Sequence, residues 1–498
     1  MSGSARRSWA CVGLIVVATA VAYAPSLLVP FQFDDYARIV DNAALQQGEW
    51  GVALGWLGTT RLLPSLTIVA NYLAGGDQVL GYHVVNVALH LLAALAVFAL
   101  ARVVCRAPRL RGGSAAARPL TVATVAALVM ACHPLQTQAV TYIIQRAAVM
   151  ATLFYVAAVA CYARGRLSQC GAAPGAPLGW FVAAAGLGLG ALLSKENAAS
   201  LPLALLLTEW VVIGGRPGSR ALERGAALCA ALLLVPLAWK IAAWRPAAPA
   251  PTSWLAYAWA AILSQGSEPS AATPYTYLLT QCTVVPAYLR LFLLPWGLNV
   301  DHDVPLATGL TPPVLAGMAV LVVLLVAGVL AARRAPLVGF GVLWFFVALG
   351  VESSVLPISD AMMEHRVYLA MPGLGLVVGA AVARLATRAP RLALAAAVLL
   401  GVSLVALTFA RNVVWQSPVS LWLDAADKSP RKARVLVNLG VAWHGAGQLD
   451  AAARQYCRAL ALDPTLTLAG ENLELILEER GIPASIGIEA YCAELSRR

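Results

Sequence analysis

Charged side chains are scarce in this sequence. Asp, Glu, Lys and Arg make up only 12% of its 498 residues, whereas hydrophobic residues make up 60%. An ordinary soluble domain carries about 25% charged residues. A soluble fold of this length could not remove so much apolar surface from water. The composition therefore excludes a soluble globular protein and indicates one that is surrounded by lipid.

The sequence also lacks a Cys-x-x-Cys pair and any cluster of Cys and His with the spacing of metal ligands. No metal site is predicted for that reason. Most of the nine cysteines lie in or beside apolar stretches, where Cys behaves as a small hydrophobic residue. Cys457 and Cys492 instead lie together near the C-terminus. A disulfide between them is an open alternative, which requires an oxidising compartment.

Long apolar runs are abundant. A membrane-spanning helix needs roughly 20 mostly apolar residues, and eleven stretches are predicted to span: 8–29, 82–104, 119–136, 146–164, 178–193, 198–214, 225–243, 311–332, 335–351, 367–387 and 391–410. The first is long for a signal peptide, so we expect an uncleaved helix. A further apolar piece, 282–296, is short and contains two prolines, and we predict a re-entrant or interfacial helix there.

The net charge of +11 is mostly arginine. In membrane proteins such an excess is typical of cytoplasmic loops, which we favour over nucleic-acid binding. With a cytoplasmic N-terminus, all five segments expected on that side are rich in Arg: 102–118, 164–166, 216–224, 333–334 and 384–391. Eleven crossings then place everything after Arg411 outside the cytoplasm.

Side chains that catalyse reactions gather in the segments expected outside. The adjacent carboxylates of Asp34 and Asp35 follow the first predicted helix, between aromatic residues. A carboxylate beside a like charge in a partly apolar setting has a raised pKa, which makes it a better general base. A plain solvated turn is the alternative. The pair could also bind a divalent metal, although no spacing of ligands argues for one.

Basic residues lie at the outer ends of other predicted helices: Arg146, Lys195 and Arg366. Each could simply pair with an acid, but together they could hold a phosphate group. A base for an acceptor hydroxyl and cations for a departing phosphate are what glycosyl transfer from a lipid-linked sugar requires. Further candidates in or near the outer segments are His83, His133, Glu196, Glu364 and His365.

The C-terminus carries a different pattern. Residues 433–466 fit one tetratricopeptide repeat of 34 residues, with small and aromatic residues at the helix-packing positions: Leu439, Gly440, Trp443, Ala452, Tyr456, Ala459 and Pro464. A second copy from Thr467 is degenerate. We therefore predict a transmembrane domain, 1–411, and a helical repeat domain, 412–498. The repeats serve either as a platform for a peptide or protein or as a structural cap.

Nearly the whole chain resembles the transmembrane-and-tetratricopeptide O-mannosyltransferases, including their bacterial relatives. The matching stretches, in order, are Phe33-Asp34-Asp35 with Ile39 and Asn42; Arg61-Leu62-Leu63-Pro64; Gly81 to Asn86 with His90; His133 to Gln136 and on to Gln145-Arg146; Ser194-Lys195-Glu196; Leu278 to Trp296; and Glu364 to Leu369. The resemblance implies an all-α polytopic GT-C glycosyltransferase fold followed by tetratricopeptide repeats.

The resemblance also implies a dolichyl- or polyprenyl-phosphate sugar as donor, with mannose the type case, and a Ser or Thr hydroxyl of a protein as acceptor. Asp34 and Asp35 become the catalytic candidates, and Arg146, Lys195 and Arg366 the candidates for the donor phosphate. The Ala-, Arg- and Gly-rich composition is typical of bacteria, so we expect the inner membrane and a periplasmic repeat domain. A non-enzymatic membrane scaffold and a transporter are the alternative functions.

Overall fold

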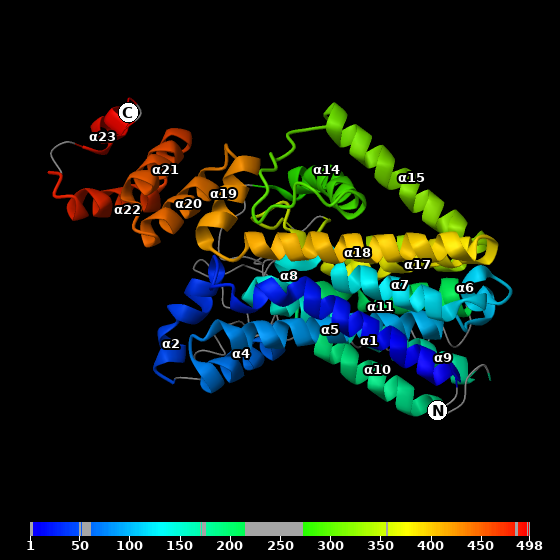
Figure 1. Ribbon diagram of the computed structural model, residues 1–498. Coiled ribbons are helices and arrows are strands. Elements are labelled where there is room, and N and C mark those ends of the chain that lie inside the picture. The colour runs from blue at the N-terminus through cyan, green and yellow to red at the C-terminus, as the bar shows by residue number, and fades with distance from the viewer. Residues whose placement is uncertain are drawn as a thin grey trace, which may run out of the picture.

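The computed structural model describes residues 3–48, 51, 61–169, 171, 176–214, 272–354, 357–483, 487–495 and 497. Within these ranges every regular element is a helix (Figure 1). In lipid an isolated segment must satisfy its own backbone hydrogen bonds, which a helix does. The predicted all-α class is confirmed.

Six helical segments of the described chain are long and apolar enough to cross a membrane: Ala5–Leu28, Val79–Val104, Ile143–Gln169, Glu196–Ile213, Pro312–Arg334 and Pro390–Val414. They contain α1 (Gly3–Tyr23), α5 (Val79–Val104), α9 (Arg146–Gln169), α11 (Leu201–Leu207), α15 (Pro312–Arg334) and α18 (Pro390–Val414). Each corresponds to a predicted span, so the chain is a multi-pass membrane protein.

The other predicted spans are less regular. The third is a bent pair, Pro119–Cys132 (α7) and Pro134–Thr141, with 51° between its halves, because Pro134 cannot continue the hydrogen-bond ladder. The fifth and ninth are shorter apolar helices, α10 (Pro177–Leu192) and α16 (Pro336–Leu349). The tenth contains α17 (Met371–Arg388). The seventh, 225–243, lies outside the described residues, so the count of eleven stays a prediction.

The stretch predicted as a re-entrant or interfacial helix belongs to a longer element, α14 (Pro274–Leu293). Thr273 caps its N-terminus in a reciprocal capping box with Thr276, which explains why the helix starts before the apolar run. The amide of Gln281 donates to the carbonyl of Ala361 at 2.9 Å. α14 therefore lies along the loop that leads into the short helix Glu364–Leu369.

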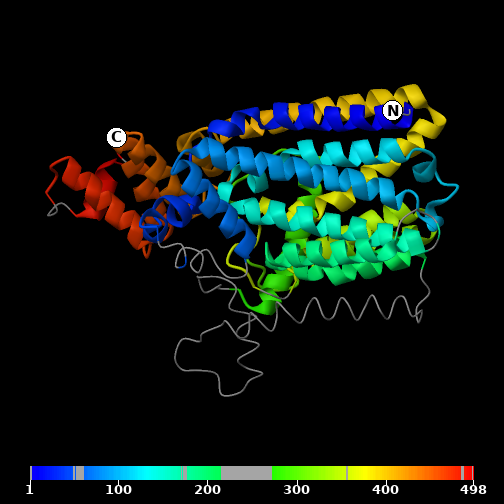
Figure 2. The ribbon, with the colours of Figure 1, turned by 90° about the horizontal axis from the view of Figure 1, so that it is seen from below.

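Close helix contacts in the bundle depend on small residues. A side chain added at Gly375 or Gly379 of α17 would meet the carbonyl oxygens of Ala126 and Val122 of α7 at 2.9 and 2.7 Å. Small residues that let backbones approach are the usual means of packing helices in lipid. Figures 1 and 2 show the result, a bundle of roughly parallel helices with the N-terminus at one end.

The C-terminal helices lie at the opposite end of that bundle (Figures 1 and 2). They are α19 (Pro418–Lys428), α20 (Ala433–Gly445), α21 (Leu449–Leu462), α22 (Thr467–Glu479) and α23 (Ile488–Leu495). α20 and α21 occupy the positions expected for the two helices of the predicted repeat, and Gly440 lies directly against the ring of Tyr456. The assignment to the repeat family and the domain boundary stay predictions.

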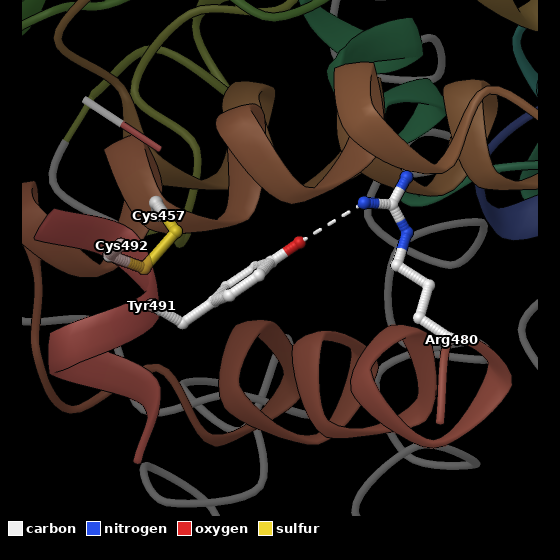
Figure 3. The surroundings of a disulfide bond; sticks show 4 residues. All are labelled: Cys457, Arg480, Tyr491 and Cys492. Atoms are coloured by element: carbon white, nitrogen blue, oxygen red, sulfur yellow. Dashed lines mark hydrogen bonds between the residues drawn. A yellow bond between two sulfur atoms is a disulfide. The ribbon is translucent and has the colours of Figure 1, made fainter. Parts of the chain in front are cut away.

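Cys457 of α21 and Cys492 of α23 form a disulfide, with 35 residues of sequence separation (Figure 3). The open alternative is thereby decided in favour of pairing. Beside the disulfide, the guanidinium of Arg480 donates to the hydroxyl of Tyr491 at 3.4 Å. Together the covalent and polar contacts attach the last helix to the preceding ones.

One hydrophobic core joins the C-terminal helices to the adjacent end of the bundle. It includes Leu436 and Tyr456 of the C-terminal helices, and it continues into Val29, Tyr142 and Val300. The latter three come from segments that connect membrane helices. The C-terminal domain is therefore packed onto the bundle and not suspended from it by a linker.

Candidate active site

Asp35 lies in the turn that follows α1, and its side chain is only 1% exposed. Its carboxylate accepts hydrogen bonds from the backbone amides of Gln32 at 3.1 Å and Ile144 at 2.9 Å. Burial raises the pKa of Asp35 to about 7, against the opposing effect of these amides. Asp35 thus joins the loop after α1 to the start of α9.

Asp34 has a different environment, since its side chain is exposed. Its backbone amide donates to the hydroxyl of Tyr142 at 2.9 Å, and that hydroxyl also bonds to the Asp34 carboxylate. The partial burial of this carboxylate raises its pKa, although Tyr142, Arg38 and Arg434 act in the opposite direction. Of the two predicted catalytic acids, Asp34 is the one that a substrate can reach.

Lys195 and Arg366 lie in one buried polar cluster. The ammonium of Lys195 pairs with Glu352 at 2.7 Å. The guanidinium of Arg366 donates to the hydroxyl of Tyr277 at 3.4 Å and has no carboxylate within ion-pair distance among the described residues. A cation that is 95% buried beside a neutral hydroxyl is available to an anionic ligand.

Arg61 belongs to the same cluster. It forms an ion pair with Glu196 at 3.4 Å. The charges of Lys195, Arg366 and Arg61 all act on His365, whose pKa is lowered mainly by burial and further by these three cations. Three cations therefore act on a neutral imidazole, and two carboxylates, Glu196 and Glu352, partly balance them.

Asp34 has an electrostatic effect on one cation of the cluster. The negative charge of Glu196 is the main reason that the pKa of Arg61 is raised, and the charge of Asp34 acts in the same direction. The larger effect comes from Glu196, which is bonded to Arg61, so Asp34 acts on the cluster without contacting it. The structure thus brings together Lys195, Arg366, Glu196 and His365 of the predicted residues and adds Arg61, whereas the direct partner of Asp34 is Tyr142.

Arg146 is separate from that cluster. Its guanidinium has no exposed surface and donates to Asn86 at 2.5 Å, to Thr67 at 3.1 Å and to the carbonyl of Tyr82 at 3.1 Å. Every nitrogen of the group is thereby used. The contacts hold the N-terminus of α9 in place behind Asp35, and the predicted phosphate contact of Arg146 would require this network to open.

The remaining predicted residues hold backbone segments together. His83 bonds to the carbonyl of Val29 at 2.8 Å, and His133 bonds to the carbonyl of Phe292 at 2.9 Å. Glu364 accepts from the amide of Asn299 at 2.6 Å and contacts His302 at 2.9 Å. These contacts are structural, because each joins two loops or helices far apart in the sequence.

Sequence reasoning missed three members of the site. Arg61 carried a signal, since it opens one of the stretches that support the family resemblance. Glu352 begins a polar outer segment, but nothing in the sequence pairs it with Lys195. Tyr277 lies in an ordinary-looking helix. Within the described ranges, no three His, Cys, Asp or Glu side chains are grouped as metal ligands would be.

Comparison with known proteins supports the predicted resemblance. Protein O-mannosyl-transferase Tmtc1 of Drosophila melanogaster is 32% identical over 212 residues, which cover 40% of this chain and 22% of that protein. Protein O-mannosyl-transferase TMTC3 of Mus musculus is 30% identical over 168 residues, which cover 31% and 17%. The chain thus spans about a fifth of the length of these curated relatives. The predicted relation to O-mannosyltransferases is confirmed. The assignment of the C-terminal helices to tetratricopeptide repeats is not tested by these matches and stays a prediction.

No protein-family model matches the chain. Among solved structures, ArnT from Cupriavidus metallidurans bound to undecaprenyl phosphate aligns with a TM-score of 0.47 and 17% identity, over 95% of this chain and 78% of that one. The apo form of the same protein aligns with a TM-score of 0.44.

Proposed function

We propose that this relative of the O-mannosyltransferases is a membrane glycosyltransferase. It moves one sugar, mannose in the first instance, from a polyprenyl-phosphate donor to an acceptor hydroxyl outside the cytoplasm, with Ser or Thr of a protein as the expected acceptor. The observation that carries the proposal is the buried Arg366, which has no carboxylate partner among the described residues and shares a polar cluster with Lys195. The exposed residue Asp34 supplies the base.

The proposed step is a single displacement at the anomeric carbon. The acceptor oxygen forms a bond to that carbon, and its proton passes to the carboxylate of Asp34. The bond between the anomeric carbon and the phosphate oxygen breaks, and the polyprenyl phosphate leaves with the electron pair. Lys195, Arg366 and Arg61 stabilise the charge that develops on the leaving oxygen. Asp35 acts on this step only by holding the turn.

We also propose that the site and the C-terminal domain lie outside the cytoplasm, in the periplasm of a bacterium, with the N-terminus inside. Two observations support this orientation. A disulfide such as Cys457–Cys492 persists in oxidising compartments. The arginine-rich segments 102–118 and 333–334 belong to the helix ends far from the C-terminal domain (Figure 1).

The test is sugar transfer in isolated membranes. Radiolabelled polyprenyl-phosphate mannose is supplied to the wild-type chain and to Asp34→Asn, Asp35→Asn and Asp41→Asn variants, and label in protein is counted. Asp41 is a matched control, because it is an exposed carboxylate of the same loop. We expect Asp34→Asn to abolish transfer, by about 10²-fold or more, and Asp41→Asn to have no effect.

Transfer that survives in Asp34→Asn at the wild-type rate would remove the proposed base. Wild-type membranes that label no protein would next receive other lipid-linked sugars and lipid or glycan acceptors. Failure with all of them would favour a scaffold without chemistry. Asp35→Asn should retain part of its activity, because its carboxylate bonds backbone amides and faces no open surface.

A further inference from the structure

The residue before Asp34 has an unusual backbone conformation. Phe33 has a φ of 49°, and it is the one residue other than glycine with a positive φ in the described part of the chain. A bulky side chain is unfavourable in this left-handed region, so the conformation persists only where the surroundings impose it. Since Phe33 directly precedes Asp34, its conformation determines the direction in which the Asp34 carboxylate projects.

Groups of the C-terminal domain surround the Phe33 ring. Its centroid lies 5.6 Å from that of Trp422 in α19 and 6.2 Å from that of Tyr142. The guanidinium of Arg434 in α20 lies over the ring at 5.5 Å from its centroid. Two of these three contacts therefore come from helices that follow the membrane bundle.

Arg434 is itself fixed by acids of two outer loops. Its Nε and Nη2 donate to the Asp301 carboxylate at 2.9 and 2.8 Å, and Nη2 also donates to Asp360 at 2.6 Å. A planar guanidinium that is bound at two edges has one orientation. In that orientation the guanidinium lies over the ring of Phe33.

The end of α19 and the turn before α20 make further contacts with the same loop. The ammonium of Lys428 donates to the carbonyl of Leu298 at 2.7 Å. The hydroxyl of Ser429 accepts from the side-chain amide of Asn299 at 2.8 Å and from the backbone of Asp303 at 3.1 Å. The loop 298–303 and the N-terminus of α20 thus form one rigid unit around Arg434.

We propose that Arg434 is a positioning residue for Asp34, through which the C-terminal helical domain holds Phe33 in its left-handed conformation and so sets the direction of the base. The inference rests on the proposed function of Asp34. This proposal gives the C-terminal domain a role besides acceptor binding or capping, since residues of α19 and α20 contact the turn that carries the base. Without Arg434 the turn relaxes, and the Asp34 carboxylate no longer has a fixed direction.

A simpler role for Arg434 is to attach the domain to the bundle. The two roles predict different effects for Arg434→Gln. Attachment alone predicts looser contacts in α20 and in the loop 298–303, with an unchanged turn at Asp34. Positioning predicts a change at the turn itself, where the Asp34 amide donates to Tyr142 at 2.9 Å.

The experiment combines hydrogen–deuterium exchange with kinetics on the full chain in detergent. The variants are Arg434→Gln, Arg434→Lys and the control Arg431→Gln, which removes an exposed arginine from the same segment. In Arg434→Gln we expect the peptide that contains Asp34 to exchange about tenfold faster or more. Its kcat should fall about tenfold or more while the donor KM stays unchanged, because the base is misplaced and the phosphate site is intact.

Arg434→Lys should recover part of both losses, because Lys keeps the charge but not the planar fork. Arg431→Gln should match the wild type. Wild-type exchange at the Asp34 turn in Arg434→Gln, with α20 and α21 still protected, would overturn the proposal. The exchange result stands even if no transferase activity is found, so failure of this inference and failure of the proposed function are distinguishable.

A variant within the turn covers the case in which Arg434→Gln does not fold. Phe33→Leu removes the ring that Arg434 and Trp422 hold, and it leaves the ion pairs of Arg434 in place. We expect faster exchange at Asp34 and a lower kcat, with wild-type protection in α20. Unchanged exchange and kcat in Phe33→Leu would refute the positioning role.

Discussion

Replacing Asp35 by Asn should change how stability depends on pH. The Asp35 carboxylate is 1% exposed, and burial is the main reason that its pKa is about 7. The amides of Gln32 and Ile144 favour the charged form but do not compensate for the loss of water. Asn has nearly the same shape as a protonated Asp and keeps one acceptor oxygen, so the variant resembles the low-pH form of the wild type.

The size of the effect follows from the shift in pKa. Asp35 has a pKa of about 7 in the folded protein, against a usual value of 3.8. Each unit corresponds to about 1.4 kcal/mol, so a shift of about three units amounts to about 4 kcal/mol. The folded state holds the proton more tightly than the unfolded state. This contribution to stability is therefore complete below about pH 4 and is lost as the pH rises through about 7.

The assay is thermal unfolding in detergent at one fixed scan rate, from about pH 4 to about pH 8, for the wild type, Asp35→Asn and Asp41→Asn. Other groups also titrate in this range, so the informative quantity is the difference between variant and wild type. We expect Asp35→Asn to gain about 5–10 °C relative to the wild type as the pH rises across this range. A difference that does not vary with pH would refute the reasoning, and Asp41→Asn should show no such trend.

Two further predictions concern the cationic cluster and the disulfide. Arg366→Gln should raise the donor KM about 10–100-fold, because hydrogen bonds to charged groups contribute about 1.5–3 kcal/mol. The control Arg384→Gln replaces an exposed arginine of α17 and should leave the donor KM unchanged. Equal effects of the two variants in donor titrations would contradict the assignment. Cys457→Ser with Cys492→Ser opens a loop of 35 residues and should destabilise the C-terminal helices by up to about 4 kcal/mol. Their unfolding temperature should fall in the variant and in the reduced wild type alike, and an unchanged temperature would contradict this.

Hydropathy predicted most of the membrane bundle because lipid imposes a simple rule. A segment that crosses must be helical, apolar and about 20 residues long, and spans such as α5 and α15 follow it directly. The rule gives no information on bends or partners. The break between α7 and Pro134, and the extension of α14 back to Pro274, depend on a proline and on a capping box, which a hydropathy window averages away.

The candidate site was predictable in composition but not in geometry. Asp34 and Asp35 are equivalent in the sequence, and only Tyr142 and Ile144, more than 100 residues away, give them different environments. Arg146 and Arg366 are likewise both basic residues near outer helix ends. Asn86 and Thr67 enclose the first, whereas the second has a neutral hydroxyl as its partner. Residue type and position near a helix end do not specify which neighbour a side chain meets.

The proposed positioning role of Arg434 could not be predicted from the sequence around it. It lies 400 residues after Asp34 in a domain whose sequence pattern concerns only packing between its own helices. Its partners Asp301 and Asp360 come from two further segments. Four parts of the chain must be placed in space before their common meeting point at Arg434 can be recognised.

The proposed sidedness of the site does not depend on the exact number of spans. α18 begins beside the arginines of α17 and ends beside α19, so it alone leads from the arginine-rich end of the bundle to the C-terminal domain. Asp34 is attached to that domain through Phe33, and Gln32 bonds to the carbonyl of Trp415 just after α18. In the described residues, Asp34 and the disulfide therefore lie at one end of the bundle and the arginines of α17 at the other. Positive residues favour the cytoplasm and disulfides favour oxidising compartments, so both rules support the same orientation.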